Sequence, residues 1–387
     1  MKLKRLTALL LSAMMVLSLA ACGGGDDTKA DSGSGDLSGK EIIIGNITPV
    51  TGAQAAYGLA ITNSIQLAID EINAAGGILG ATVKLSTKDD QGTPAEAVSG
   101  FNSLLSEGAS AIIGATLSSC TSAITSLADD EGIVLVTPSS TADSITTKDD
   151  YVFRSCFKDS FQGEMVAAYA KDQGWTKAAV LYATGDTSFV KAAEKYGIEI
   201  VCEQSSSDTG AVDFSSQLAT IAASGADMLF APYYYDAVGP KIIPQAREAG
   251  FKGAIMGCDG FDGTQDYTTG DLSAYENVYF TNHYSPEDSS EIVQNYVKNY
   301  TAKYGSESMN ALGALAYDAM YMVKQAIEKA GSIDHDAIRD AMSGMHYVGV
   351  TGDMTLDETG TPEKSVAILT FTPSDGKLVQ KFVKTQS

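Results

Sequence analysis

The chain has 387 residues, with 26 basic against 48 acidic side chains, a formal net charge of −22 and 44% hydrophobic residues. At roughly 150 residues per domain, it has room for about two domains with full cores. The acidity argues against nucleic acid as a partner and against an electrostatic hold on anionic lipid, because both need clusters of Lys and Arg. The three histidines, His283, His335 and His346, share no metal-ligand spacing, so neither a metal nor a cofactor is expected.

The first 21 residues have the pattern of a secretory signal peptide. Met1–Arg5 is basic, and Leu6–Ala21 is a nearly unbroken apolar run of 16 residues. Such a run spans about 24 Å as a helix, short of the ~30 Å hydrocarbon core, which favours a cleaved peptide over a transmembrane helix. Its end, Leu19-Ala20-Ala21-Cys22, resembles a bacterial lipobox and predicts a lipid on Cys22; the alternative is an ordinary signal peptide with a chance cysteine.

Residues 22–40 are predicted to form a flexible tether. They are rich in Gly, Ser and Asp, and after the cysteine they contain one hydrophobic residue larger than Ala, which is Leu37. Such a composition cannot bury a core. The mature protein is therefore expected outside the cytoplasm, attached to the cell membrane by its lipid alone.

Beyond the tether, short apolar runs alternate with helical patterns. Residues 41–47 suit a buried parallel strand, and the spacing of Ile61, Ile65 and Ile72 marks one face of a helix that ends at Gly76. Further strands are predicted at 82–86, 111–115, 133–137, 178–182, 199–203, 228–232, 254–257 and 278–284. Further helices are predicted at 94–107, 119–131, 161–173, 187–196, 214–223, 238–249, 289–304 and 311–330. Two series of alternating β and α predict two doubly wound α/β lobes.

Two hydroxyl-rich loops follow adjacent strands of the first lobe, where a ligand of an open α/β sheet lies. One contains Ser118 and Ser119, and the other contains Ser139, Ser140 and Thr141. The first opens a helix, whose free N–H groups favour an anion. Hydroxyls and amides with no Arg or Lys among them suit a carboxylate better than a phosphate. The alternative is helix capping, a common structural use of Ser and Thr.

The loops after two strands of the second lobe carry aromatic and acidic residues. Tyr233-Tyr234-Tyr235 suits the wall of a pocket, or alternatively an aromatic cluster packed on the lobe. Asp259 can accept hydrogen bonds from a ligand ammonium, or alternatively form an Asx turn before Gly260. Hydroxyl donors on one side, and an acid with aromatics on the other, predict a zwitterionic ligand, a small α-amino acid.

From residue 42 to about residue 371 the chain resembles the solute-binding proteins of branched-chain amino acid ABC transporters. The segments that carry the resemblance are 52–58, 70–78, 86–90, 112–119, 131–138, 213–215, 245–250, 257–260 and 349–360. The resemblance implies a type I periplasmic-binding-protein fold, in which two Rossmann-like lobes close on a ligand about three hinge crossings, near Arg154, His283 and Val350. It implies a first lobe of residues 41–153 plus 284–349 and a second lobe of residues 154–283 plus 350–387.

The resemblance also implies roles for individual residues. The hydroxyls of Ser118 and Thr141 match groups that hold the ligand α-carboxylate. The backbone carbonyl of Ser139 and the carboxylate of Asp259 match groups that hold its α-ammonium. These four residues would therefore bind the two charged ends of one amino acid.

Tyr57 and Tyr234 match aromatic positions that line the side-chain pocket in the same family. The family's Tyr-Gly-x-Gly segment is absent, because residues 182–188 look shortened, and this leaves the side-chain specificity open. Spacing assigns no disulfide among Cys120, Cys156, Cys202 and Cys258, and a bond between Cys120 and Cys258 is not expected because it would lock the lobes together.

The predicted function is capture of a small amino acid, most readily Leu, Ile or Val, by a monomeric lipid-anchored protein that delivers it to the permease subunits of an ABC transporter. No enzymatic role is expected, because the sequence has no Gly-x-Ser-x-Gly and no His-Glu-x-x-His segment, and no His in its site loops. The alternatives are another small solute, such as an aromatic amino acid or an amide, and a ligand sensor that serves a receptor.

Overall fold

The computed structural model describes residues 35–148, 150–183, 188–206, 213–268, 270–306 and 308–386. The predicted signal peptide, the predicted lipid site at Cys22 and most of the predicted tether lie outside these residues. None of the helices in these ranges combines the length and the apolar character that a membrane-spanning segment requires. The folded body begins at Leu37, which is buried and whose N–H donates to the carbonyl of Leu79 at 2.7 Å. The predicted tether therefore ends before residue 40.

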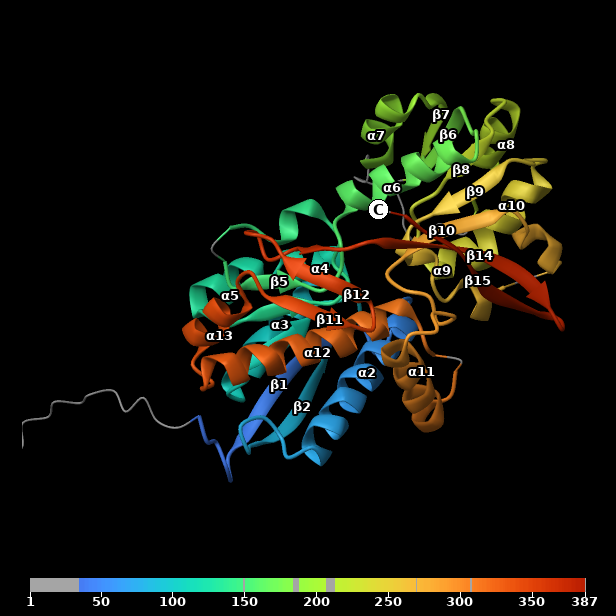
Figure 1. The fold of residues 1–387 in the computed structure, drawn as a ribbon. Helices are drawn as coiled ribbons and strands as arrows, with labels where there is room; N and C mark the ends of the chain where they lie inside the picture. Colours follow the sequence, from blue (N-terminus) through green and yellow to red (C-terminus); the bar gives the residue numbers. More distant parts are fainter. Residues whose placement is uncertain are drawn as a thin grey trace, which may run out of the picture. The chain divides into compact units, whose positions relative to one another are not determined.

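The first lobe is built on a parallel sheet with the strand order β2-β1-β3-β4-β5 (Figure 1). Its strands are β1 (Glu41–Thr48), β2 (Thr82–Asp89), β3 (Ala111–Gly114), β4 (Leu135–Thr137) and β5 (Val152–Arg154). One face packs against α2 (Ala55–Ala74), α12 (Ala311–Ala330) and α13 (His335–Met342). The other face packs against α3 (Pro94–Ser106), α4 (Ser118–Ser122) and α5 (Thr125–Glu131). Apolar strands covered on both faces confirm the prediction of a doubly wound lobe.

The helix predicted at 119–131 is wrong, because the chain forms two short helices there. Between them the Ala123 N–H donates to the Cys120 carbonyl at 3.3 Å, and the Ile124 N–H donates to the Thr121 carbonyl at 2.9 Å. These bonds span three residues rather than four, so the turn tightens and the helix axis is interrupted. The expected helix-dipole contribution at Ser118 is correspondingly small, since α4 has only 5 residues.

The second lobe is built on a sheet with the strand order β15-β14-β10-β9-β8-β6-β7 (Figure 1). Its strands are β6 (Lys177–Tyr182), β7 (Glu199–Ser205), β8 (Met228–Phe230), β9 (Ala254–Gly257), β10 (Val278–Asn282), β14 (Val366–Ser374) and β15 (Lys377–Gln386). The first five are parallel, and β14 and β15 add an antiparallel edge.

Helices cover both faces of this second sheet as well. One face packs against α6 (Asp159–Asp172) and α7 (Ser188–Tyr196). The other face packs against α8 (Ser215–Ala223), α9 (Tyr235–Ala237) and α10 (Ile243–Glu248). The helix predicted at 238–249 is only partly regular, because a π-helical turn at Val238–Ile242 separates α9 from α10. That turn contains Pro240, which has no N–H to donate to a regular helix.

A small antiparallel sheet stays with the first lobe. It consists of β11 (His346–Gly349), β12 (Gly352–Leu356) and β13 (Pro362–Glu363). Met354 and Leu356 are buried in the first-lobe core, and the Arg154 N–H donates to the Gly360 carbonyl at 3.1 Å. The chain then enters β14 through Lys364 and Ser365, which lie further along the sequence than the expected crossing near Val350.

The three passages between the lobes contact one another. The first joins β5 to α6, and the second joins β10 to α11 (Glu291–Tyr304). Phe157 of the first passage stacks on His283 of the second, with ring centroids 3.8 Å apart and an interplanar angle of 21°. Lys364 of the third passage donates from Nζ to the Thr351 hydroxyl at 2.8 Å and to the Ser155 carbonyl at 3.4 Å.

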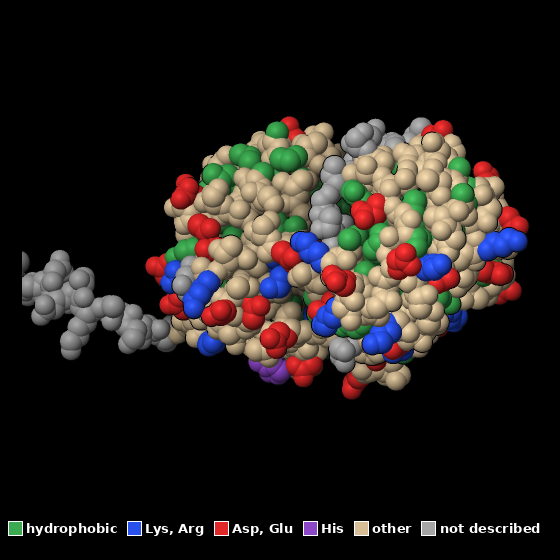
Figure 2. Space-filling model, turned by 90° about the horizontal axis from the view of Figure 1, so that it is seen from above, with side chains coloured by type: hydrophobic (Ala, Val, Ile, Leu, Met, Phe, Trp, Pro, Cys, Tyr) green, Lys and Arg blue, Asp and Glu red, His purple; other side chains and the backbone are tan. Residues whose placement is uncertain are grey.

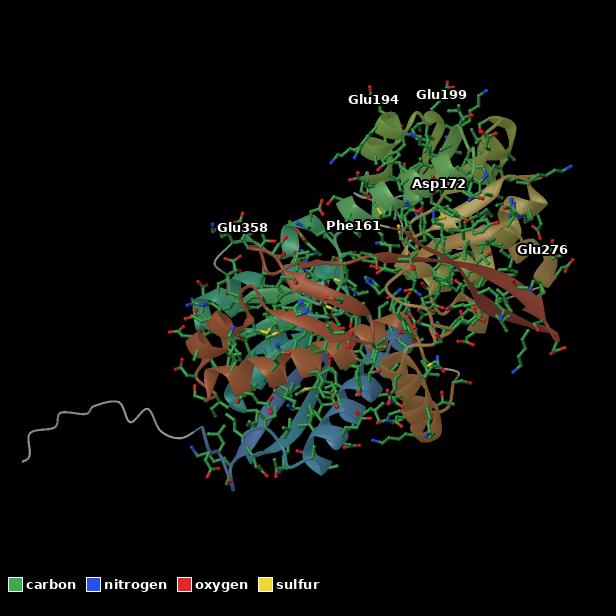
Figure 3. The ribbon with its side chains drawn as sticks, viewed as in Figure 1. Phe161, Asp172, Glu194, Glu199, Glu276 and Glu358 are labelled. Carbon is green, nitrogen blue, oxygen red and sulfur yellow. The ribbon has the colours of Figure 1, made fainter. Side chains whose placement is uncertain are left out.

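Acidic side chains are exposed at many places on the surface, whereas Asp90, Asp262 and Asp318 are buried. Glu194, Glu199, Glu276 and Glu358 are exposed, and Figure 3 shows them at the periphery of the molecule. On the face seen in Figure 2, acidic and basic side chains are interspersed. This arrangement agrees with a solvated acidic surface.

Candidate ligand-binding site

Tyr57 links the first lobe to the second at the start of α2. A Cβ on the next residue, Gly58, would lie 2.0 Å from the carbonyl oxygen of Pro49, so only glycine lets the helix begin against the loop that follows β1. The Tyr57 side chain is fully buried, and its hydroxyl donates to the carbonyl of Gly260 at 2.7 Å. Burial and the negative charge of Asp259 raise the pKa of Tyr57, so the phenol keeps its proton and remains a donor.

The aromatic residues predicted for the pocket lie together. The Tyr57 ring meets the ring of Tyr234 edge-on, with centroids 6.0 Å apart, and that of Tyr235 with centroids 4.7 Å apart. Tyr234 keeps 39% of its surface exposed, whereas Tyr235 is fully buried. The Tyr235 hydroxyl accepts from the Ala56 N–H at 3.3 Å and donates to the Ala53 carbonyl at 2.9 Å. Tyr234 therefore remains available to a ligand, while Tyr235 packs and bonds across the lobes.

Several hydroxyls of the two polar loops hold the loops to each other. The hydroxyls of Thr121 and Ser140 lie 2.6 Å apart, and the Ser139 hydroxyl donates to the Thr116 carbonyl at 2.8 Å. All four residues are buried. The structural alternative therefore accounts for these hydroxyls, because a hydroxyl has a single proton to donate and the Ser139 proton is engaged.

Three residues of the same loops keep groups that a zwitterion needs. The Ser118 hydroxyl accepts from the Ala142 N–H at 3.3 Å, which leaves its own proton to donate. The Thr141 carbonyl accepts from the Asp159 N–H at 2.8 Å, but among the described residues the Thr141 hydroxyl and N–H have no hydrogen-bond partner. The carbonyl of Ser139 likewise accepts no hydrogen bond from any of the described residues.

Asp259 is held by neutral partners. Its Oδ1 accepts from Gln162 Nε2 at 3.2 Å, and its Oδ2 lies 3.1 Å from His283 Nε2. Burial lowers the pKa of His283 to about 4, so this histidine is neutral at physiological pH and donates a hydrogen bond from Nε2. No Lys or Arg of the described residues lies within ion-pair distance of Asp259. The carboxylate is therefore held in one orientation, and its negative charge is not neutralised by a cationic side chain.

Gln162 fixes both the side chain and the backbone of this position. Gln162 Oε1 accepts from the Asp259 N–H at 2.8 Å and from the Thr281 hydroxyl at 2.6 Å. The Asp259 side chain is 12% exposed. A partly accessible carboxylate with a fixed orientation can accept from an ammonium group.

Helix α6 connects the two halves of the predicted site. The Asp159 N–H at its start bonds to Thr141, and Gln162, one turn later, bonds to Asp259. Within the described ranges, no direct hydrogen bond joins Asp259 to the hydroxyl-rich loops. Neither Gln162 nor His283 was predicted as a site residue. A histidine near the end of the predicted strand 278–284 was the one signal available, and nothing in the sequence pointed to the glutamine.

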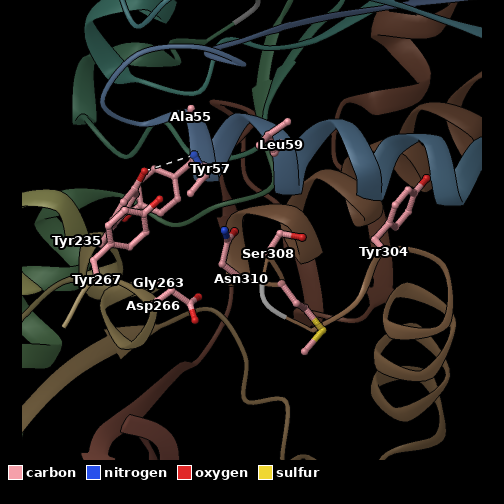
Figure 4. Close-up of a pocket in the computed structure, with 12 residues that line it drawn as sticks. Ala55, Tyr57, Leu59, Tyr235, Gly263, Asp266, Tyr267, Tyr304, Ser308 and Asn310 are labelled. Atoms are coloured by element: carbon pink, nitrogen blue, oxygen red, sulfur yellow. Dashed lines mark hydrogen bonds between the residues drawn. The ribbon is translucent and has the colours of Figure 1, made fainter. Parts of the chain in front are cut away.

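A separate pocket of about 600 Å³ lies beside the same aromatic residues (Figure 4). It is lined from the first lobe by Ala55, Ala56, Tyr57, Leu59, Tyr304, Ser308, Met309 and Asn310, and from the second by Tyr235, Gly263, Asp266 and Tyr267. Of the predicted ligand residues, only Tyr57 lines it, so it is not the predicted ligand site. The described residues include no group of three or more His, Cys, Asp or Glu that could hold a metal ion.

The body cysteines are present as thiols in the structure. Cys120, Cys156 and Cys258 are buried, and Cys202 is partly exposed. Burial raises the pKa of both Cys120 and Cys156 to about 12, so neither forms the reactive thiolate near neutral pH.

Two doubly wound lobes, three passages between them and polar groups on facing loops define a two-lobed binding protein. The chain belongs to the periplasmic binding protein family, and the match to this family covers residues 41–377. It is 30% identical over 356 residues to "Leu/Ile/Val-binding protein homolog 3" of Brucella melitensis, a match that covers 88% of this chain and 93% of the relative. The predicted family and the predicted type I fold are both confirmed.

Solved structures agree with this assignment. The branched-chain amino acid transporter substrate-binding protein LivJ of Streptococcus pneumoniae, in complex with isoleucine, has a TM-score of 0.80 and 30% identity and covers 90% of this chain and 100% of its own. A solute-binding protein of Rhodopseudomonas palustris in complex with 3,4-dihydroxybenzoic acid has a TM-score of 0.81 and 23% identity and covers 89% of this chain and 97% of its own. At 23% identity, the similarity to the Rhodopseudomonas palustris protein concerns the fold alone.

Proposed function

We propose that this protein captures a branched-chain amino acid outside the cytoplasm and presents it to the permease subunits of an ABC transporter. The α-carboxylate of the ligand lies against Ser118 and Thr141 of the first lobe. Its α-ammonium lies between the carbonyl of Ser139 and the carboxylate of Asp259, and its side chain lies against Tyr57 and Tyr234. Binding then involves both lobes, so the ligand favours their closed arrangement.

The observation that carries this proposal is the state of Asp259. Its carboxylate is partly buried and held by Gln162 and His283, both neutral, and among the described residues it has no cationic partner. A buried charge of this kind is costly unless it is compensated, and a ligand ammonium compensates it. The relatives named for Leu, Ile and Val and the isoleucine complex support an aliphatic side chain on that ammonium-bearing ligand.

The same proposal includes the attachment of the protein. Cleavage before Cys22 and diacylation of its thiol would hold the mature chain at the outer surface of the membrane. The supporting observation is the lipobox-like sequence at 19–22, which lies outside the described residues. We infer a monomer with no catalytic step, because the proposed task consists of binding and release alone.

An aromatic carboxylate is the competing ligand class, since a structural neighbour binds 3,4-dihydroxybenzoic acid. Such a ligand has no ammonium, so it would leave the charge of Asp259 uncompensated inside the closed site. The aliphatic α-amino acid is therefore the better electrostatic match.

A thermal-shift screen tests the ligand. The purified mature chain is melted with each of the twenty amino acids, with benzoate and with 3,4-dihydroxybenzoate. Leu, Ile or Val at about 1,000 times its Kd should stabilise the protein by about 4 kcal/mol and raise Tm by several degrees. A rise with the benzoates and none with any aliphatic amino acid would refute the ligand assignment. Loss of [³H]palmitate labelling in a Cys22→Ser chain, expressed with its full leader, tests the anchor.

A further inference from the structure

Arg154 is a fully buried arginine directly behind the loop that contains Thr141. It is the last residue of β5, and none of its side-chain surface is exposed. One terminal nitrogen, Nη1, donates to the carbonyl of Ser140 at 3.0 Å. The other, Nη2, donates to the carbonyl of Ala142 at 3.1 Å and to the hydroxyl of Thr146 at 3.0 Å. The guanidinium group therefore holds the peptide group that precedes Thr141 and the carbonyl of the residue that follows it.

No carboxylate of the described residues lies within ion-pair distance of this guanidinium group. Asp159, Asp143 and Asp357 are near enough to influence the pKa of Arg154, but its hydrogen bonds go to two carbonyls and a hydroxyl. Its Nε is buried without a partner. An arginine keeps its proton at physiological pH even when burial lowers its pKa, so a positive charge lies unpaired behind the loop.

The direction of the held carbonyl determines the direction of the neighbouring N–H. In a trans peptide the C=O and the following N–H point to opposite sides. Because the Ser140 carbonyl points at Arg154, the Thr141 N–H of the same peptide points away from it. That N–H is one of the groups left without a partner among the described residues. Arg154 thereby presents a free donor, with a positive charge behind it, on the side of the loop away from the strand.

We infer that Arg154 is the positioning residue for the carboxylate end of the ligand, fixing the Thr141 N–H as a donor and supplying the charge that complements the ligand anion. This inference rests on the proposed function and deepens it. It explains how a site whose loops carry hydroxyls and no Lys or Arg can select a fully ionised carboxylate. Removing Arg154 should weaken ligands in proportion to the charge of their carboxyl group.

The chain offers a matched control in Arg247. This arginine also donates to backbone carbonyls, those of Ala274, Phe251, Gly253 and Glu276, but it does so in the second lobe, with no bond to a predicted ligand residue. Arg247→Gln should lower Tm and leave ligand selectivity unchanged. It measures what the loss of a structural arginine does without the proposed role.

The experiment measures the Kd of leucine by calorimetry and that of leucinamide by competition with leucine, in the wild type, Arg154→Gln, Arg154→Lys and Arg247→Gln. Leucinamide keeps the ammonium and side chain but lacks the carboxylate charge. Arg154→Gln should raise the Kd of leucine about 30-fold and that of leucinamide less than about threefold, which corresponds to the loss of one charge-assisted interaction. Arg154→Lys should give an intermediate change, because it keeps the charge but not the fork that holds two carbonyls.

Two results would overturn the inference alone. One is a leucine Kd within about threefold of the wild type in a folded Arg154→Gln protein. The other is an equal weakening of leucine and leucinamide, the pattern of a purely structural residue. If Arg154→Gln fails to fold, the ratio in Arg154→Lys decides in the same way. A wild type that binds leucinamide as tightly as leucine, or that binds no carboxylate-bearing solute, would refute the proposed function as well.

Discussion

Replacement of Asp259 by asparagine removes one negative charge with little change in size. The introduced amide keeps one oxygen to accept from Gln162. His283 can move its proton to Nδ1, which is buried without a partner, and its Nε2 can then accept from the amide nitrogen. The local hydrogen bonds are therefore conserved, and the ligand-free protein should retain its fold and its Tm to within a few degrees.

The loss in binding follows from the missing charge. A hydrogen bond to a charged group is worth about 1.5–3 kcal/mol, against about 1 kcal/mol for a neutral pair. Because the neutral partners of Asp259 leave its charge to the ligand ammonium, most of this energy should be lost. Asp259→Asn is expected to raise the Kd of leucine by about 10- to 100-fold.

Isothermal titration calorimetry of the wild type, Asp259→Asn and Asp227→Asn measures this effect. Asp227 accepts from the N–H groups of Thr176 and Lys177 at the opposite end of β8, so its replacement controls for the loss of an acid in the same lobe. The des-amino analogue 4-methylpentanoate should bind Asp259→Asn at least as well as the wild type. Leucine binding by Asp259→Asn within threefold of the wild type, with the fold intact, would contradict the role given to this carboxylate.

Three further predictions concern pH and lobe closure. Burial lowers the pKa of His283 from 6.5 to about 4, so between these pH values the imidazole is protonated in the unfolded chain and neutral in the folded chain. The free energy of unfolding should therefore fall by up to about 3 kcal/mol as the pH drops from about 6.5 to 4. The free energy of unfolding of His283→Gln, measured by urea titration, should lack that part of the pH dependence. An unchanged pH profile would show that another group causes it. Burial raises the pKa of Asp90 from 3.8 to about 6, so its contribution to stability depends on pH in the opposite direction to that of His283. This contribution is present at low pH and is lost as the pH rises through 6. Asp90→Asn should stabilise the protein by about 1–3 kcal/mol at pH 7 and hardly at all at pH 3.5; equal effects at both pH values would disprove this. Tyr57→Phe removes the hydrogen bond to the Gly260 carbonyl, and should raise the Kd of leucine about fivefold and enlarge the radius of gyration in small-angle scattering, whereas identical scattering curves would show that this bond does not hold the lobes together.

The local pattern of the sequence was sufficient for most of the two lobes. β1 was predictable because Ile42 and Ile44 belong to a short continuous apolar run, and α2 because its isoleucines repeat at helical spacing. The strands β14 and β15 were not predicted. All residues of β15 except Leu378 are exposed or half-buried, and it contains Lys at positions 377, 381 and 384, so its pattern resembles a solvated tail. It is a strand because β14 pairs with it along its length, which is tertiary information.

Candidate site residues could be predicted from the sequence only where a polar or acidic side chain lies in the loop that follows a strand. Ser118, Thr141 and Asp259 all stand in such loops, so topology alone placed them at the carboxyl edges of their sheets. Gln162 lies within a helix, and His283 follows β10 at a passage between the lobes. What makes them relevant is packing between elements distant in sequence, because Gln162 and Asp259 are 97 positions apart. Sequence spacing carries no information on such a contact.

The two residues behind the predicted ligand contacts lie where the chain passes between the lobes. Arg154 ends β5 at the first passage and holds the loop of Thr141. His283 begins the second passage and donates to Asp259, while its ring stacks on Phe157 of the first. Because both residues lie at these passages, we expect a rotation of one lobe on the other to act on the groups proposed for the carboxylate and the ammonium. The passages about which closure is expected therefore carry residues that orient both proposed ends of the site, so ligand affinity and lobe closure should respond together to substitutions at these positions.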